Sequence, residues 1–144
     1  MESPTELRLD LVMDLLLSPE EAFPVPARLR YSVDDPYAVH IAFHVDAARP
    51  IGWYFARDLL VQGLLRPTGL GDVRIWPTAA DGRRSVTLML CSPDGDAFLQ
   101  APAAPLAAWA RHTLRLVPPG GAAERARVDR ALDALFAANA APDA

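Results

Sequence analysis

The sequence predicts an α+β fold built from seven antiparallel strands and about three helices. Three features of the chain support this. Apolar and polar residues alternate with period two in several runs within residues 7–101, which is typical of half-buried strands. Short segments rich in Asp, Gly and Pro separate these runs. Beyond residue 105 the apolar residues recur at helical spacing.

The size and composition indicate a single domain over residues 1–144. A chain of this length buries about 68–70% of the surface exposed when unfolded, so its core needs no metal or disulfide. Cys91 is the one cysteine, which is compatible with a reducing cytoplasm. Charged residues interrupt the first apolar run, so we expect a strand there and no secretory signal. Since no run approaches about 20 apolar residues, membrane insertion is not expected.

Four alternating runs predict the first four strands. They span residues 7–15, 28–33, 37–45 and 51–55. In the third run, Tyr37, Val39 and Ile41 share one face, and His40 and His44 share the other. The connections are short, so a meander of antiparallel strands is expected. Pro24 and Pro26 exclude residues 23–26 from a central strand.

The second half of the chain alternates between helices and strands. A short helix is predicted over residues 57–65, where Pro67 stops it, and residues 68–72 form a loop. Strands follow at residues 73–76, 85–91 and 96–101, joined by turns at residues 80–82 and 92–95. Helices are predicted over residues 105–117 and 123–138, separated by Pro118-Pro119-Gly120-Gly121.

No residue pattern in the chain indicates a metal, cofactor or catalytic site. His40 and His44 are four apart on a strand, about 13 Å, which is too far for two ligands of one zinc ion. The loop at residues 68–72 lacks the Lys-Ser/Thr of a phosphate loop and leads into a strand, so a tight turn is expected. Cys91 has no evident catalytic partner and is expected to act as a small hydrophobe. We therefore predict a protein that is not an enzyme and needs no cofactor.

Arg57 and Asp58 allow two interpretations. Asp58 near the start of a helix suits the helix dipole, which is a structural role. Alternatively the pair belongs to a recognition surface. The large side chains of Trp53, Trp76 and Trp109 are expected in the core or at a subunit interface.

Several short motifs occur in an order and spacing that match one known family. They are Pro24-Val25-Pro26 with Leu29-Arg30-Tyr31, Asp35-Pro36-Tyr37-Ala38-Val39-His40 with Phe43-His44, Phe55-Ala56-Arg57-Asp58-Leu59-Leu60 with Gly63-Leu64, Arg66-Pro67-Thr68-Gly69 with Gly71-Asp72-Val73-Arg74, Trp76-Pro77, and Ser92-Pro93-Asp94-Gly95 with Ala101-Pro102. Together they resemble the SsgA-like family of sporulation and cell-division regulators of actinomycetes, and its SsgB-like members most closely. The resemblance covers about residues 6–119.

This resemblance implies a fold and a function. The family fold is a β-barrel-like arrangement with flanking helices, similar to Whirly-type single-stranded nucleic-acid binders and assembled as a homotrimer. Its SsgB-like members are non-catalytic and help to recruit the division GTPase FtsZ to septa. We accordingly expect a cytoplasmic protein, concentrated at division septa, that positions septal proteins such as FtsZ or its membrane-bound recruiters. The candidate partner-binding residues are Arg57, Asp58, Arg74 and Trp76, with a role in holding the fold together as the alternative for each.

Two other functions remain open. A single-stranded nucleic-acid binder requires a basic groove with stacking aromatic residues. Such a groove would have to be formed by arginines, and the candidates are Arg28, Arg30, Arg66, Arg74, Arg83 and Arg84. The net charge of −4 argues against this function, because phosphate contacts dominate such binding. An enzyme would need a deep pocket lined by converging polar groups.

Overall fold

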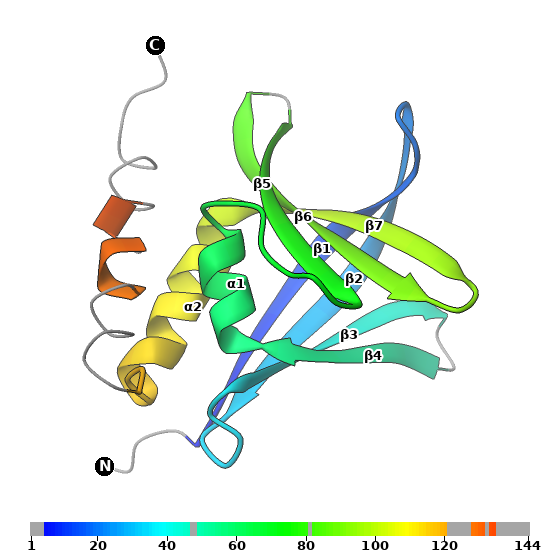
Figure 1. The fold of residues 1–144 in the computed structure, drawn as a ribbon. Helices are drawn as coiled ribbons and strands as arrows, with labels where there is room; N and C mark the ends of the chain where they lie inside the picture. Colours follow the sequence, from blue (N-terminus) through cyan, green and yellow to red (C-terminus); the bar gives the residue numbers. More distant parts are fainter. Residues whose placement is uncertain (1–4, 47–48, 81, 121–127, 132, 135–144) are drawn as a thin grey trace.

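A computed structural model of the chain describes residues 5–46, 49–80, 82–120, 128–131 and 133–134. Figure 1 shows a strongly curved sheet with helices packed on one side of it. The strands are β1 (Glu6–Ser18), β2 (Glu21–Ser32), β3 (Ala38–Asp46), β4 (Arg49–Ala56), β5 (Val73–Ala80), β6 (Arg83–Ser92) and β7 (Gly95–Pro102). The helices are α1 (Arg57–Gly63) and α2 (Ala103–Leu116).

All seven strands form one antiparallel sheet in the order β4-β3-β2-β1-β7-β6-β5. Two meanders, β1–β4 and β5–β7, are joined where Asp14 pairs with Gln100 and Leu15 with Leu99. The end strands β4 and β5 do not pair with each other, so the curled sheet is a half-barrel open along one side. The predicted α+β class, the strand count and the antiparallel meander are confirmed.

The prediction that two prolines exclude residues 23–26 from a central strand is wrong. Pro24 and Pro26 lie within β2, which is central, and pair there with Asp14 and Val12 of β1. The registered pairs between β2 and β3 run from Ala27 to Arg30. In its proline-containing half, β2 therefore has one neighbour, and its other side has no ladder for a proline to interrupt. For the same reason the edge strand β5 continues through Pro77, beyond the predicted end at Trp76.

The turns follow the predicted chemistry. Gly95 closes the β6–β7 turn with a φ of +131°, and the Ser92 hydroxyl donates to its carbonyl oxygen at 2.9 Å. Gly69 has a φ of +108°, which confirms a tight turn that needs a glycine. That turn is held by two backbone hydrogen bonds between Thr68 and Ile75, of 2.9 and 3.0 Å.

The helices begin and end close to their predicted positions. Helix α1 stops at Gly63, two residues before the predicted end, and α2 begins two residues before the predicted start. Residues 128–131 and 133–134 are helical and belong to the predicted helix 123–138; its other residues lie outside the described part, as do residues 47–48 and 81 of two predicted turns. Val128 and Ala131 are buried, so this third helix also contributes to the core.

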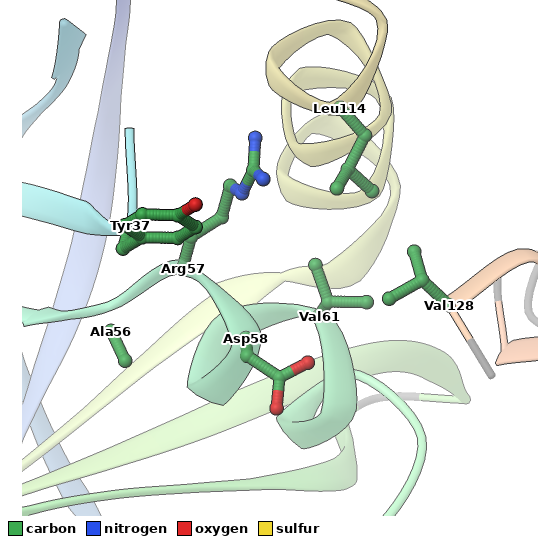
Figure 2. Close-up of a pocket in the computed structure, with 7 residues that line it drawn as sticks. All are labelled: Tyr37, Ala56, Arg57, Asp58, Val61, Leu114 and Val128. Carbon is green, nitrogen blue, oxygen red and sulfur yellow. The ribbon is translucent and has the colours of Figure 1, made fainter. Parts of the chain in front are cut away.

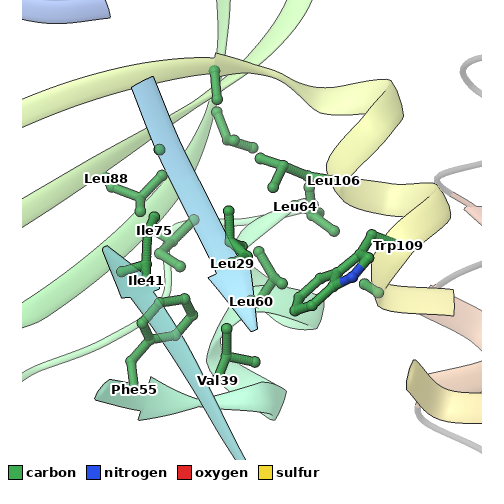
Figure 3. Packing of buried hydrophobic residues seen from close by; sticks show 14 of the residues in the cluster. Leu29, Val39, Ile41, Phe55, Leu60, Leu64, Ile75, Leu88, Leu106 and Trp109 are labelled. Atoms are coloured by element: carbon green, nitrogen blue, oxygen red, sulfur yellow. The ribbon is translucent and has the colours of Figure 1, made fainter. Parts of the chain in front are cut away.

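The core lies between the inner face of the sheet and the two helices. Figure 3 shows Leu29, Val39 and Ile41 of the sheet meeting Leu60 of α1, Leu64 directly after it, and Leu106 and Trp109 of α2. Each of the fully buried aliphatic side chains stabilises the fold by about 1.5–3 kcal/mol. Trp109 is a core residue, as expected. Tyr37 is 65% exposed and does not join the face of Val39 and Ile41, because β3 starts one residue after it.

Candidate functional site

The side chain of Arg57 points into the protein and caps the carboxyl end of helix α2. Its side chain is 4% exposed. Its Nη1 group donates to the Tyr31 hydroxyl at 2.9 Å and to the carbonyl oxygens of Thr113 at 3.2 Å and Val117 at 2.7 Å. The guanidinium carbon also lies 5.4 Å from the centre of the Tyr31 ring. A cation at the carboxyl end of a helix complements the helix dipole, so these contacts stabilise the fold.

A small pocket of about 110 Å³ lies beside Arg57. It is lined by Tyr37, Ala56, Arg57, Asp58, Val61, Leu114 and Val128. In Figure 2 the guanidinium of Arg57 extends towards α2, whereas the carboxylate of Asp58 points away from it. Most of the lining is apolar and its polar groups do not converge, so this pocket lacks the arrangement that an enzyme site requires.

Asp58 begins a row of polar side chains along α1. The Gln62 amide nitrogen donates to the Asp58 carboxylate at 3.4 Å, and Arg66 donates to the Gln62 side-chain oxygen. Asp58 and Gln62 are four apart and share one face of α1, and Arg66 continues the row in the turn after the helix, where its N–H donates to the Gln62 carbonyl oxygen at 3.0 Å. Asp58 is half-buried, whereas Arg66 at the far end of the row is exposed.

Arg74 and Trp76 lie on the outer face of the sheet, opposite the helices. Ile75 between them is fully buried on the inner face, and alternation turns its two neighbours outward. In the register of the sheet Arg74 pairs with Met89, and Met89 pairs with Phe98. The Trp76 and Phe98 rings meet edge-on with centroids 6.3 Å apart. We call Arg74, Trp76, Met89 and Phe98 the outer β5–β7 patch.

The four predicted partner-binding residues are therefore divided between two places. Arg57 and Asp58 belong to α1, while Arg74 and Trp76 come together on the outer face. Met89 and Phe98 were not singled out from the sequence. Their strands were predicted, but which residues of β5, β6 and β7 lie opposite one another depends on the register.

The arginines to be tested for a nucleic-acid groove are spread over different elements. Arg28 pairs with Asp10 at 2.7 Å and Arg30 with Glu6 at 4.0 Å, both on the outer face of β1 and β2. The hydrogen bond from Arg28 also lowers the pKa of the Asp10 carboxyl. Arg66 lies three residues after the end of α1, Arg74 lies on β5, and Arg83 and Arg84 begin β6. Arg30 and Arg83 line different pockets.

His40 and His44 lie on the outer face of β3, as predicted. His40 is half-buried against the Tyr54 ring, with ring centroids 4.5 Å apart, and His44 is exposed. Burial lowers the pKa of the His40 imidazole, and the charge of Arg30 lowers it further. Within the described part of the chain no group of three or more His, Cys, Asp or Glu residues is placed to hold a metal ion.

The lowered pKa of His40 predicts a loss of stability in mild acid. The unfolded chain takes up a proton on His40 below the ordinary value of 6.5, while the folded protein resists it. The free energy of unfolding should therefore keep its full value above that pH and fall as the pH drops towards the lowered pKa. Urea unfolding of the wild type and His40→Gln between about pH 5 and 8 measures this. Parallel pH profiles for the two proteins would contradict it.

No helix in the described residues is long and apolar enough to span a membrane.

Sequence comparison identifies relatives over most of the chain. Residues 25–122 match the family described as Streptomyces sporulation and cell division protein, SsgA. The sporulation-specific cell division protein SsgB of Streptomyces coelicolor is 45% identical over 133 residues, covering 92% of this chain and 97% of that protein. SsgB of Thermobifida fusca is 42% identical over 127 residues, covering 88% and 92%.

Solved structures of SsgB and SsgA-like proteins share the fold of this chain. A structure from work on SsgB mutations that correlate to longitudinal cell division in Streptomyces coelicolor superposes with a TM-score of 0.78 at 45% identity, covering 88% of this chain and 99% of that one. An SsgA-like sporulation-specific cell division protein from Thermobifida fusca gives a TM-score of 0.76 at 40% identity, covering 96% and 98%. The half-barrel, the family match and these relatives agree, and the chain belongs to the SsgA-like family of sporulation and cell division proteins.

Proposed function

We propose that this chain is a non-catalytic regulator of cell division that positions or recruits septal proteins, such as FtsZ or its membrane-bound recruiters, at division septa. Its similarity to proteins named sporulation-specific cell division proteins supports a role in cell division. The outer β5–β7 patch supports binding of a protein. Its location would be the cytoplasm, concentrated at septa.

The composition of the outer β5–β7 patch is that of a protein-binding surface. Trp, Arg, Met and Phe are enriched at interfaces, and Trp and Arg are frequent among residues that dominate binding energy. Arg74 is exposed, Phe98 is 36% exposed, and Trp76 and Met89 are half-buried. Partial burial holds the aromatic rings in place before a partner arrives, which reduces the entropy lost on binding.

Mutations in this patch should weaken partner binding without unfolding the protein. We expect Trp76→Ala and Arg74→Glu each to lower affinity for a septal partner about 10- to 100-fold, as for central interface residues. Binding of each variant to purified FtsZ from the host, and to its membrane-bound recruiters, measures this. Tyr54→Ala is the matched control, because Tyr54 is an aromatic residue, 70% exposed, on the far edge strand.

The outcome that would contradict this site is clear. If Arg74→Glu binds as the wild type does, the outer β5–β7 patch is not the recognition surface. If neither FtsZ nor its membrane-bound recruiters bind the wild type, the proposed recruitment is wrong. A fluorescent fusion spread evenly through the cell would argue against septal location.

We also propose that the chain assembles as a homotrimer. Exposed large apolar residues support self-association, among them Val12, Leu17, Phe23 and Ile51. Light scattering during gel filtration should give about three times the chain mass of 15.6 kDa. A monomer mass at working concentration would contradict this assembly.

A single-stranded nucleic-acid function has less support. The likeness to Whirly-type binders stays a prediction, and fold analogy is a weak guide to function. Two of the six arginines are paired with acidic residues, Arg66 and Arg74 lie on different segments, and Arg83 and Arg84 share β6. The absence of a salt-sensitive mobility shift with oligonucleotides would agree with this.

A further inference from the structure

A polar pocket opens on the outer face of the sheet, where the two meanders are joined. It has a volume of about 500 Å³. In Figure 1 the β1–β2 hairpin and the β5–β6 hairpin diverge at the top of the view, and the pocket lies between strands of the two. Strands β1, β6 and β7 supply its lining, which includes Val12, Asp14, Arg83, Ser85, Gln100 and Pro102. We call it the junction pocket.

The junction pocket lies where the pairing between β1 and β7 ends. The registered pairs between these strands are Asp14 with Gln100 and Leu15 with Leu99. Beyond Gln100 the ladder stops, and Pro102 has no N–H with which to extend it. The pocket therefore opens between two strands that are no longer paired.

The polar side chains of the junction pocket are not used by the fold. They lie on the outer face, because their sequence neighbours, such as Val86, are buried on the inner face. Asp14 and Arg83 make no ion pair, and the Gln100 amide makes no hydrogen bond, with any described residue. Ser85 is 8% exposed, and its hydroxyl has no hydrogen-bond partner in the described part of the chain. A buried polar group without a protein partner that lines a pocket points to a ligand.

One end of the junction pocket is suited to a carboxylate. Arg83 supplies a guanidinium there, and Ser85 supplies a hydroxyl. Ser85 pairs with Pro102, and helix α2 begins directly afterwards at Ala103 with no side-chain cap. The partial positive charge at the amino end of a helix adds to the charge of Arg83. Asp14 carries the negative charge of the lining, which suits a cationic group on the same ligand.

The separation of the two charges favours a peptide over a free amino acid. Asp14 pairs with Gln100, Gln100 pairs with Thr87, and Arg83 is four residues before Thr87. In a flat sheet these steps place the Cα atoms of Asp14 and Arg83 about 16 Å apart, and the side chains shorten the gap. A free amino acid carries its ammonium and carboxylate on one carbon atom. An extended peptide advances about 3.3 Å per residue, so a cationic side chain two residues before a terminal carboxylate can reach across the pocket.

We propose that the junction pocket binds the free carboxyl terminus of a partner peptide that carries Lys or Arg two residues before its end. The terminal carboxylate accepts hydrogen bonds from the Arg83 guanidinium and the Ser85 hydroxyl. The Gln100 amide bonds to the peptide backbone, and Asp14 pairs with the cationic side chain. The pocket shares no residue with the outer β5–β7 patch, so this binding goes beyond the proposed recruitment and does not depend on it.

Two labelled tetrapeptides test the carboxylate site. Both have the sequence Ala-Lys-Ala-Ala with a dye at the amino end; one ends in a free carboxylate and the other in a carboxamide. In fluorescence anisotropy we expect the acid to bind the full chain at least about tenfold more tightly. Arg83→Met should abolish this preference, whereas the matched control Arg84→Met, at the next residue and exposed outside the pocket, should keep it. Equal binding of the two peptides, or no binding of either up to about 1 mM, would overturn the proposal.

Ser85→Ala separates a binding role from a structural one. Because the hydroxyl has no partner in the fold, its removal should leave the urea unfolding midpoint unchanged or raise it. The affinity for the acid peptide should fall about tenfold, as expected for a hydrogen bond to a charged group. A lower midpoint with unchanged affinity would show that the hydroxyl serves the fold, and would overturn its role in binding.

Charge reversal and competition test the identity of the ligand. Asp14→Lys should bind the acid peptide Ala-Glu-Ala-Ala more tightly than Ala-Lys-Ala-Ala, the reverse of the wild type. An unchanged preference would overturn the role of Asp14. If inorganic phosphate displaces the labelled acid peptide as well as unlabelled peptide does, the pocket is a general anion site and the proposal is wrong. Trp76→Ala should bind the peptide as the wild type does, so failure at the outer β5–β7 patch is distinguished from failure here.

Discussion

Replacement of Arg57 by methionine is expected to lower the free energy of unfolding by about 3 kcal/mol. Methionine fills much of the same space but donates no hydrogen bonds. The Tyr31 hydroxyl and the carbonyl oxygens of Thr113 and Val117 then lose the donor that they share. The Tyr31 hydroxyl still donates to the Pro36 carbonyl, and the Thr113 carbonyl still accepts from the Val117 N–H. The largest loss is therefore expected at the Val117 carbonyl, since a polar group deprived of its donor costs about 1–3 kcal/mol, and the end of α2 loses its cation as well.

Urea unfolding followed by circular dichroism measures this loss. Arg74→Met is the matched control, because Arg74 is exposed on the outer face and its replacement should change stability by less than about 0.5 kcal/mol. Arg57→Lys should recover part of the loss, since an ammonium group restores the charge without the geometry of the guanidinium. Wild-type stability in Arg57→Met would show that the contacts of Arg57 are not needed for the fold.

The same variants decide between the two interpretations of Arg57. If it stabilises the fold, Arg57→Lys should bind the septal partner with the affinity of the wild type at a temperature where both are folded. If Arg57 contacts the partner, affinity should fall in Arg57→Lys while stability is kept. Because the side chain is 4% exposed, we expect the first result.

Substitution of Gly63 by alanine is expected to destabilise the protein by about 2 kcal/mol. A Cβ atom at this position would lie 2.5 Å from the Cβ and 2.6 Å from the Cγ2 of Ile75. Ile75 is fully buried in β5 and its branched side chain is stiff, so α1 and β5 would have to move apart. The intrinsic preference of alanine over glycine in a helix, about 1 kcal/mol, offsets part of this cost.

Gly52→Ala provides a control with a similar local clash and a different expected result. Its Cβ would lie 2.7 Å from the Nε2 of His40, at the far end of a flexible side chain. His40 can rotate away at the cost of its contact with Tyr54, so we expect a loss below about 1 kcal/mol. Thermal and urea unfolding of both variants measure the difference. Equal losses would contradict close packing of α1 on β5 as the cause.

Much of the fold could be predicted from local patterns. Period-two alternation together with turn residues located all seven strands, and the turn at residues 92–95 joins the strands it was expected to join. Proline was a less certain guide. Proline interrupts a strand only where the neighbouring strand requires an N–H donor at that position. The sequence does not show that β2 pairs with β3 over only part of its length.

The candidate site depended more on distant contacts. Arg57 and Asp58 are adjacent in sequence, yet only Arg57 is buried. The carboxyl end of α2, with the carbonyl oxygens of residues 113 and 117 more than 50 positions away, packs against its side chain. Trp76 meets Phe98 across an intervening strand. An apolar pocket on the inner face, lined by Ile51, Trp53 and Leu90 among others, draws on six strands, and no single segment of the chain indicates it.

Local patterns in the sequence are enough to predict the α+β class, the antiparallel strands, the turns and the family, because alternation, turn residues and motif spacing are properties of neighbouring residues. The joining of the two meanders through β1 and β7, the burial of Arg57 and the outer β5–β7 patch become visible only in the folded protein. Strand register and burial arise from packing between segments far apart in the chain, and local preferences do not specify which segments meet.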